Sequence, residues 1–163
     1  MAFIVAICIA ELLFILFLIK KSYLIYQELC RSAYEHDKEK RLVYLCQRYL
    51  MNQNVIKEYM TSAHIQRIAI YGIGEVYAVF KQELMRDVNV RYCIDKYSSK
   101  KIVDGKNVVN PADIPKLEPV DAILVTAVGF YEEIKEELQR DFNISIPIID
   151  IEEVMNYDQQ KRL

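Results

Sequence analysis

Two glycines, Gly72 and Gly74, stand between an apolar run and a helix-forming segment. The run is Ile68–Tyr71, and the segment that follows begins at Glu75. In a strand–turn–helix unit the first glycine permits a sharp turn, and the second lets a phosphate approach the backbone beside the positive end of the helix dipole. This spacing predicts a phosphate-binding loop, in which the Glu75 carboxylate is acceptable only if it turns to solvent.

An acid stands at the end of the next predicted strand, as in sites that bind the ribose of a dinucleotide. It is Asp95, which lies 21 residues after Gly74. Tyr77 departs from that pattern, because a small residue normally lets the helix pack tightly on the first strand. We expect Tyr77 either to push helix and strand apart or to swing into the cleft. A working, a modified and an empty cleft stay open as alternatives.

Two further candidate ligand neighbours end the fourth predicted strand, in the stretch "TAVGF". They are Thr126 and Gly129, and the carboxyl ends of parallel strands line the binding crevice of an open sheet. The alternative is that these residues simply end the strand.

Acid–base catalysis by a tyrosine and a lysine needs both on one helix, with the lysine lowering the tyrosine pKa. The spacing Tyr-x-x-x-Lys occurs four times, at Tyr77/Lys81, Tyr92/Lys96, Tyr97/Lys101 and Tyr131/Lys135. Four occurrences among twelve tyrosines show that the spacing arises easily. We therefore assign no catalytic residue, and the scattered histidines and cysteines suggest no metal site.

From residue 64 onward, strand-like and helix-like segments alternate. The predicted strands are Ile68–Tyr71, Val88–Asp95, Val108–Val109, Asp121–Ala127 and Ile146–Ile151. Helical connections between them predict an α/β fold with a doubly wound parallel sheet of about five strands, in the order 3-2-1-4-5. Within it, Asn110 and Pro111 have the residue types of a helix start.

The N-terminal stretch is strongly apolar. Thirteen of residues 1–19 are Ile, Leu, Phe or Val, and a helix of that length is close to the thickness of a bilayer core. We predict a single transmembrane helix over 1–21, with Lys20-Lys21 holding its C-terminal end on the cytoplasmic side of the inner membrane. Glu11 would pair with another membrane helix or stay protonated.

Residues 22–63 are expected to form a helical stalk or linker, and residues 64–163 the nucleotide-binding domain. The helical pattern over 42–59 breaks near Asn52–Asn54, where Asn54 can cap a new helix. We favour packing on its own domain over a coiled coil, and association of copies through stalk or membrane helix stays open. Residues 64–163 carry thirteen basic and seventeen acidic side chains, which argues against a nucleic-acid partner.

Four features together resemble a known family: Gly72-x-Gly74, "CID", "DG" followed by "VVNPADI", and "VDAILVTA". They are similar to the small Rossmann-like modules of bacterial surface-glycan proteins, which resemble nucleoside-diphosphate-sugar epimerases and dehydratases. The resemblance covers about residues 55–157 and implies binding of NAD(P) or a nucleotide sugar at Gly72, Gly74 and Asp95. We expect an accessory or sensor in polysaccharide synthesis. The alternatives are an NAD(P)-dependent sugar epimerase or dehydratase and a non-binding adaptor.

Overall fold

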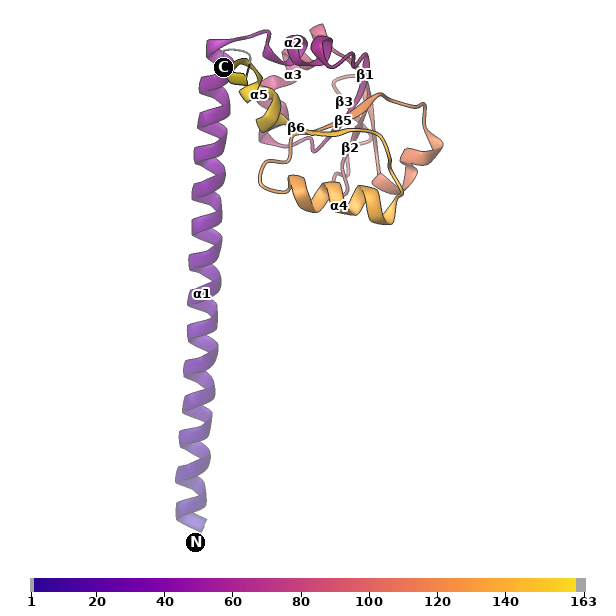
Figure 1. The fold of residues 1–163 in the computed structure, drawn as a ribbon. Helices are drawn as coiled ribbons and strands as arrows, with labels where there is room; N and C mark the ends of the chain where they lie inside the picture. The colour runs from indigo at the N-terminus through magenta and orange to yellow at the C-terminus, as the bar shows by residue number, and fades with distance from the viewer. Residues whose placement is uncertain (1, 161–163) are drawn as a thin grey trace. The chain divides into compact units, whose positions relative to one another are not determined.

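The computed structural model describes the backbone of residues 2–160 and the side chains of residues 14–157. The chain divides into two compact units, one ending at Lys40 and the other beginning at Arg41. The first helix, α1, runs from Ala2 to Met51 and so extends through the end of the first unit into the second (Figure 1). The second unit begins earlier than the domain boundary at residue 64 that the sequence suggested.

The predicted membrane span over residues 1–21 is wrong. In the part of the chain that the structure describes, no helix has a stretch long and apolar enough to cross a membrane. The inner-membrane location and the orientation inferred from Lys20-Lys21 fall with it. The side chain of Glu11 lies outside the described part of the chain.

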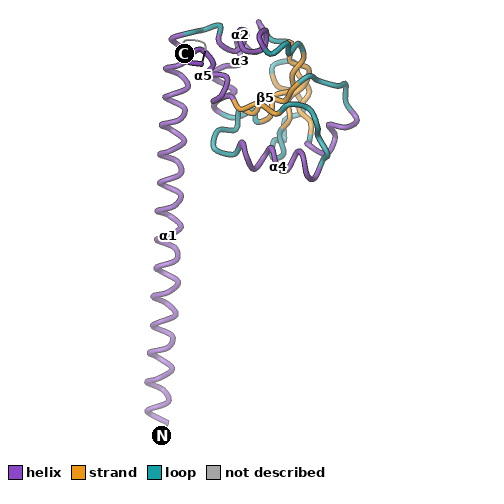
Figure 2. The backbone as a smooth tube through the Cα atoms, viewed as in Figure 1, coloured by secondary structure: helices purple, strands orange, loops and turns teal. Residues whose placement is uncertain are grey.

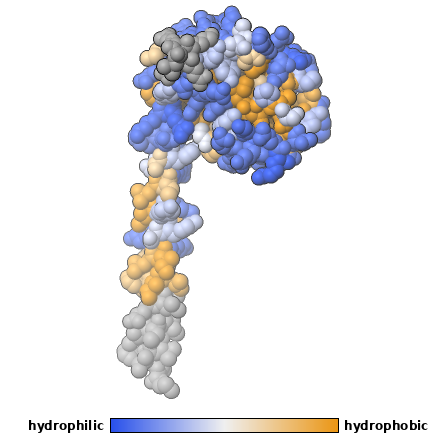
Figure 3. Space-filling model, viewed as in Figure 1, coloured by the Kyte–Doolittle hydropathy of each residue, from blue (hydrophilic) through white to orange (hydrophobic). Residues whose placement is uncertain are grey.

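Apolar side chains of α1 are nevertheless exposed over residues 14–29. Phe14, Phe17 and Leu29 each show about 60% of their surface, at 61%, 60% and 64%. Figure 3 shows apolar surface, in orange, on the described part of α1. Beyond residue 40 the helix contributes instead to the core of the second unit, where Leu45 is completely buried.

The helical segment before the sheet packs on its own domain, as favoured from the sequence. Helix α1 ends at Met51, and α2 (Val55–Ser62) begins after Asn54 at its N-cap position. Asn54 makes no side-chain capping bond, and its backbone N–H instead donates to Asn52 Oδ1 at 3.0 Å. Val55 and Ile56 are buried in the core.

The second unit is built on a six-stranded sheet in the order β3-β4-β2-β1-β5-β6. Figure 2 shows the strands in orange. All neighbouring strands are parallel except β3 and β4, which form an antiparallel hairpin. The strands are β1 (Arg67–Tyr71), β2 (Asn89–Ile94), β3 (Ile102–Val103), β4 (Lys106–Val109), β5 (Ala122–Val125) and β6 (Ile148–Asp150). The five parallel strands have the predicted order. The sixth strand, β3, is not among the strands predicted from the sequence.

Helices cover both faces of the sheet because alternate strand residues point to opposite sides. Ile68 and Ile70 of β1 enter one core with the end of α1, α2, α3 (Glu75–Asp87) and α5 (Ile151–Gln160). Ala69 and Tyr71 enter a second core beneath η1 (Pro111–Lys116) and α4 (Tyr131–Asp141). As predicted, η1 starts after Asn110, whose side chain accepts a hydrogen bond from the Ala112 N–H at 3.2 Å.

Candidate functional site

Gly72 makes the turn out of β1 at the carboxyl edge of the sheet. Its φ of +91° is in the left-handed region that favours glycine, and its N–H donates to the Ile94 carbonyl at 2.9 Å. A Cβ atom at this position would lie 3.1 Å from Ala127 Cβ and 3.2 Å from Ala127 N. Both conformation and space therefore require glycine here, where the loop after β1 meets the loop after β5.

Asp95, at the end of β2, holds this edge together. Its Oδ2 accepts a hydrogen bond from the Ile73 N–H at 3.2 Å. Ile73 lies in the loop Gly72–Gly74, which we call the glycine loop. Asp95 Oδ1 accepts from the N–H groups of Tyr97, at 2.9 Å, and Ser98, at 2.8 Å. The predicted phosphate-binding loop and the predicted ribose-binding acid, Asp95, are thus joined by a hydrogen bond. Three of the roughly four acceptor positions of the carboxylate are already used.

The start of α3 leaves open space next to the glycine loop. Gly74 is the N-cap residue, with φ −85° and ψ −152°, and no atom lies within 4 Å of a Cβ built there. The first N–H groups of a helix have no partner within the helix itself. Glu75, the first helical residue, is exposed. This end of α3 can therefore receive an anion, provided that the Glu75 carboxylate stays in solvent.

Tyr77 neither lines the cleft nor reaches its mouth. Its side chain is buried, with 3% exposure, in the core beneath α3. Its hydroxyl donates a 2.6 Å hydrogen bond to Asp104 Oδ2 in the β3–β4 turn. Burial, followed by this hydrogen bond, raises the Tyr77 pKa well above its usual value. Tyr77 therefore joins the phosphate-loop helix to the hairpin at the edge of the sheet.

The two candidate residues after β5, Thr126 and Gly129, have roles in the fold itself. Thr126 is buried, and its hydroxyl contacts the carbonyl oxygens of Tyr71, at 3.2 Å, and Gly72. Its backbone N–H donates to the Tyr71 carbonyl at 2.9 Å. Gly129 lies in the turn before α4. Thr126 thus stabilises the start of the glycine loop through these contacts and does not line the pocket.

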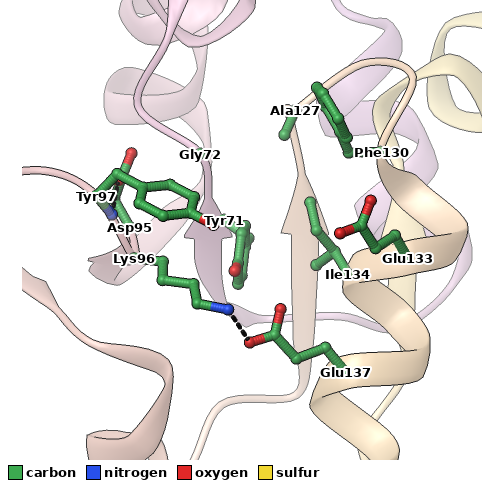
Figure 4. Close-up of a pocket in the computed structure, with 10 residues that line it drawn as sticks. All are labelled: Tyr71, Gly72, Asp95, Lys96, Tyr97, Ala127, Phe130, Glu133, Ile134 and Glu137. Atoms are coloured by element: carbon green, nitrogen blue, oxygen red, sulfur yellow. Dashed lines mark hydrogen bonds and ion pairs between the residues drawn. The ribbon is translucent and has the colours of Figure 1, made fainter. Parts of the chain in front are cut away.

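A pocket of about 260 Å³ opens at the carboxyl ends of β1, β2 and β5, against α4 (Figure 4). Only two of the predicted site residues, Gly72 and Asp95, line it. Its other lining residues are Tyr71, Lys96, Tyr97, Ala127, Phe130, Glu133, Ile134 and Glu137. The four from α4 and the turn before it were missed, because a charged helix such as "YEEIKEEL" looks like a solvated surface until the helix is docked.

Charge in this pocket is mostly negative. Lys96 Nζ forms an ion pair with Glu137 Oε1 at 2.7 Å, shown by the dashed line in Figure 4. The hydrogen bond to Glu137 raises the Lys96 pKa. Burial, and then the nearby Glu137 and Asp95 carboxylates, raise the Tyr71 pKa to about 12. Tyr71 is therefore a neutral hydrogen-bond donor at any physiological pH.

The two helical Tyr-x-x-x-Lys pairs have structural contacts. Tyr77 and Lys81 both approach Asp104, with Lys81 Nζ 3.6 Å from Oδ1. The Tyr131 hydroxyl donates to the Ile148 carbonyl at 2.9 Å, and Lys135 Nζ lies 5.3 Å from the centre of the Tyr131 ring. In neither pair does the tyrosine hydroxyl point into the pocket.

Comparison with known proteins places this unit in a family. Residues 64–156 match the family described as C2185-like, N-terminal, and this match covers more than half of the chain. The chain therefore belongs to that family. None of the curated proteins matches it. The matched range contains the whole sheet, both glycines, Asp95 and the pocket.

Proposed function

We propose that this C2185-like N-terminal domain is a Rossmann-like module that binds a nucleotide or a nucleotide sugar at the carboxyl edge of its sheet. The proposed role is that of an accessory or sensor in bacterial surface-glycan synthesis, by analogy with the modules that its sequence resembles. The strand order supports the proposal, because ligands of open parallel sheets bind where the connections of neighbouring strands diverge. In this sheet that point lies between β1 and β5.

The hydrogen bond from the Ile73 N–H to Asp95 Oδ2 is the observation that carries the proposal. It joins the glycine loop and the acid of β2 into one rigid edge beside the pocket. A ligand that meets both features would find them already in place, so little ordering would be needed on binding. The space beside Gly74, one residue further along the loop, is open.

The charges at this edge favour one orientation of a phosphate-bearing ligand over the reverse. Its phosphate would lie beside Gly74, at the positive end of α3. The uncharged part would enter the pocket, where Asp95 keeps about one acceptor position for a hydroxyl group. The reverse direction would bring phosphate beside Asp95, Glu133 and Glu137, which is electrostatically unfavourable.

A non-binding structural adaptor is the second candidate, and the Asp95 contacts favour it. The Asp95 carboxylate has three backbone donors of its own, so it has a structural reason to be present without any ligand. An NAD(P)-dependent epimerase or dehydratase has less support, because the helical Tyr-x-x-x-Lys pairs make contacts away from the pocket.

A ligand panel separates binding module from adaptor. The full chain would be heated with NAD, NADP, UDP or UDP-glucose, and a ligand at a hundred times its dissociation constant should add about 2.7 kcal/mol to the unfolding free energy. Gly74→Val is the test variant. Its side chain would enter open space, so unfolding of the free protein should change by no more than about 1 kcal/mol, the cost of a poorer N-cap.

The binding proposal expects this variant to lose the ligand-induced stabilisation, because valine occupies the space meant for the phosphate. Gly74→Ser is the matched control for folding, since serine is a favoured N-cap residue. If no nucleotide of the panel stabilises the natural protein, the adaptor takes the place of the binding module.

A further inference from the structure

Tyr71 is an almost entirely buried residue whose side chain lines the pocket. Tyr71 shows 6% of its surface, yet its hydroxyl makes no hydrogen bond within residues 14–157. Figure 4 shows the side chain pointing into the pocket, towards the pair formed by Lys96 and Glu137. Among the described residues only the Glu83 side chain has buried oxygens without a partner, so the Tyr71 hydroxyl is open to the pocket and can donate a hydrogen bond to an acceptor bound there. This hydroxyl therefore points to a ligand that carries an oxygen or nitrogen acceptor.

The Lys96–Glu137 pair offers a donor and an acceptor side by side. The two groups are 2.7 Å apart, and the Glu137 side chain is mostly buried while that of Lys96 is partly exposed. The ammonium keeps further N–H donors, and the carboxylate keeps further lone pairs, after this bond is made. An alcohol group both donates and accepts, so neighbouring hydroxyls on a ring complement such a pair.

Charge in the pocket disfavours anionic groups, and two of its three carboxylates already have partners. Asp95, Glu133 and Glu137 would repel a phosphate or a carboxylate. An ammonium group would meet Lys96, which already neutralises Glu137. Asp95 is in turn stabilised by three backbone N–H groups. An uncharged ligand loses least by entering these surroundings.

The walls and the size of the pocket narrow the class further. Tyr97 and Phe130 are aromatic residues of its lining, and both are exposed, at 89% and 42%. Aromatic faces pack against the C–H face of a sugar ring. A volume of about 260 Å³ is below the usual range for drug-sized ligands, so a single ring fits better than a whole dinucleotide.

We infer that this pocket binds an uncharged, hydroxyl-bearing ring of hexose size, with Tyr71 and the Lys96–Glu137 pair as its polar contacts. The inference rests on the proposed function only for the phosphate-bearing half of the ligand. In a nucleotide sugar, the ring in the pocket would be the sugar half. In this inference Tyr71 is a specificity-determining residue, because a nucleoside diphosphate without the sugar would offer its hydroxyl no acceptor in the pocket.

Two sets of probes test this inference on the full chain. Glucose, galactose and mannose at millimolar concentration would be followed by saturation-transfer NMR, with glucosamine as a cationic counterpart. UDP-glucose and UDP would be compared by titration calorimetry. We expect transfer to an uncharged hexose, tighter binding of UDP-glucose than of UDP, and about a fivefold loss of UDP-glucose affinity in Tyr71→Phe, which removes one hydrogen bond. The affinity for UDP should not change in that variant.

Tyr92→Phe is the matched control, because Tyr92 enters the same core from β2 without lining this pocket. Glu137→Gln provides a second variant that keeps side-chain size and should also weaken UDP-glucose selectively. Equal affinities for UDP and UDP-glucose, together with no transfer to any hexose, would overturn the inference while UDP binding keeps the proposed function. Stronger transfer to glucosamine than to glucose would overturn it as well. Hexose binding without any nucleotide binding would support it and remove the nucleotide proposal.

Discussion

The Tyr77 hydroxyl donates a 2.6 Å hydrogen bond to Asp104 Oδ2, a residue of the turn between β3 and β4. This contact explains how a tyrosine occupies the place where dinucleotide sites have a small residue. The ring lies in the core beneath α3 and its polar end reaches the hairpin, so the cleft is not filled. The departure from the fingerprint is therefore compatible with an open edge beside Gly74.

Tyr77 should matter for stability more than for ligand choice. Tyr77→Phe removes the hydrogen bond to a carboxylate and should lower the unfolding free energy by about 1 to 2 kcal/mol. Tyr77→Ala also leaves a cavity and should cost about 3 to 5 kcal/mol. Urea unfolding measures both. A Tyr77→Ala variant that is fully stable and binds NAD more tightly would show that the tyrosine obstructs a dinucleotide site instead.

Gly72 should tolerate no side chain. Gly72→Ala forces an L-residue into the left-handed region, at a cost of about 1 to 2 kcal/mol, and brings its Cβ to 3.1 Å from Ala127 Cβ. Gly105→Ala is the matched control, because Gly105 also has positive φ, at +77°, but open space around it. Denaturant unfolding should show a larger loss for Gly72→Ala. Equal losses would mean that contact with Ala127 is unimportant.

Asp95 should stabilise the domain without any ligand. In Asp95→Asn the amide nitrogen cannot accept a hydrogen bond, so at least one of the three backbone donors loses its partner. We expect a loss of about 1 to 3 kcal/mol in unfolding free energy, measured with no nucleotide present. Asp113→Asn, at an exposed carboxylate, should change stability by less than about 0.5 kcal/mol. An unchanged Asp95→Asn variant would argue for a role in binding alone.

How far the sequence could predict this molecule depends on the range of the contacts involved. Alternating strands and helices were sufficient for the order of the five parallel strands, because connection rules leave few topologies. Gly72 and Asp95 could be placed at one edge, since each follows a strand end. Tyr77 and Asp104 meet only after β4 has paired with β2, which depends on tertiary packing.

The same limit applies to the pocket wall formed by α4. Glu133 and Glu137 lie on a helix face whose charge suggested exposure to solvent, and the docking of α4 over the second core turns that face towards Tyr71. The membrane prediction failed for a different reason. It rested on the apolar composition of residues 1–19 alone, whereas no helix in the described part of the chain is long and apolar enough to cross a membrane.

The buried carboxylate of Glu83 should make the unfolding free energy depend on pH. This residue of α3 is completely buried, and neither carboxylate oxygen has a hydrogen-bond partner of normal geometry within the described structure. Burial raises its pKa to about 7, an effect that the nearby N–H groups of Lys57 and Ile56 at the start of α2 only partly offset. Asp87 raises the pKa further and Arg86 lowers it, both by smaller amounts.

The sign follows from proton binding. The ordinary pKa of a glutamate is 4.5, so between about pH 4.5 and pH 7 the folded chain holds a proton that the unfolded chain has released. The stabilisation is fully present below that range and is lost as the pH rises through the folded pKa. At pH 8 the folded protein must keep a buried charge, and its unfolding free energy should be lower by up to roughly 3 kcal/mol.

Glu83→Gln should remove this dependence, because the amide has almost the same shape and never ionises. We expect the variant to match the natural protein at pH 5 and to exceed it in unfolding free energy by up to roughly 3 kcal/mol at pH 8, measured by urea unfolding at both pH values. Glu136→Gln, at an exposed glutamate of α4, is the matched control. Its unfolding free energy should equal that of the natural protein at pH 5 and at pH 8. Equal stabilities of Glu83→Gln and the natural protein at pH 8 would mean that Glu83 ionises without penalty, with the start of α2 accommodating its charge.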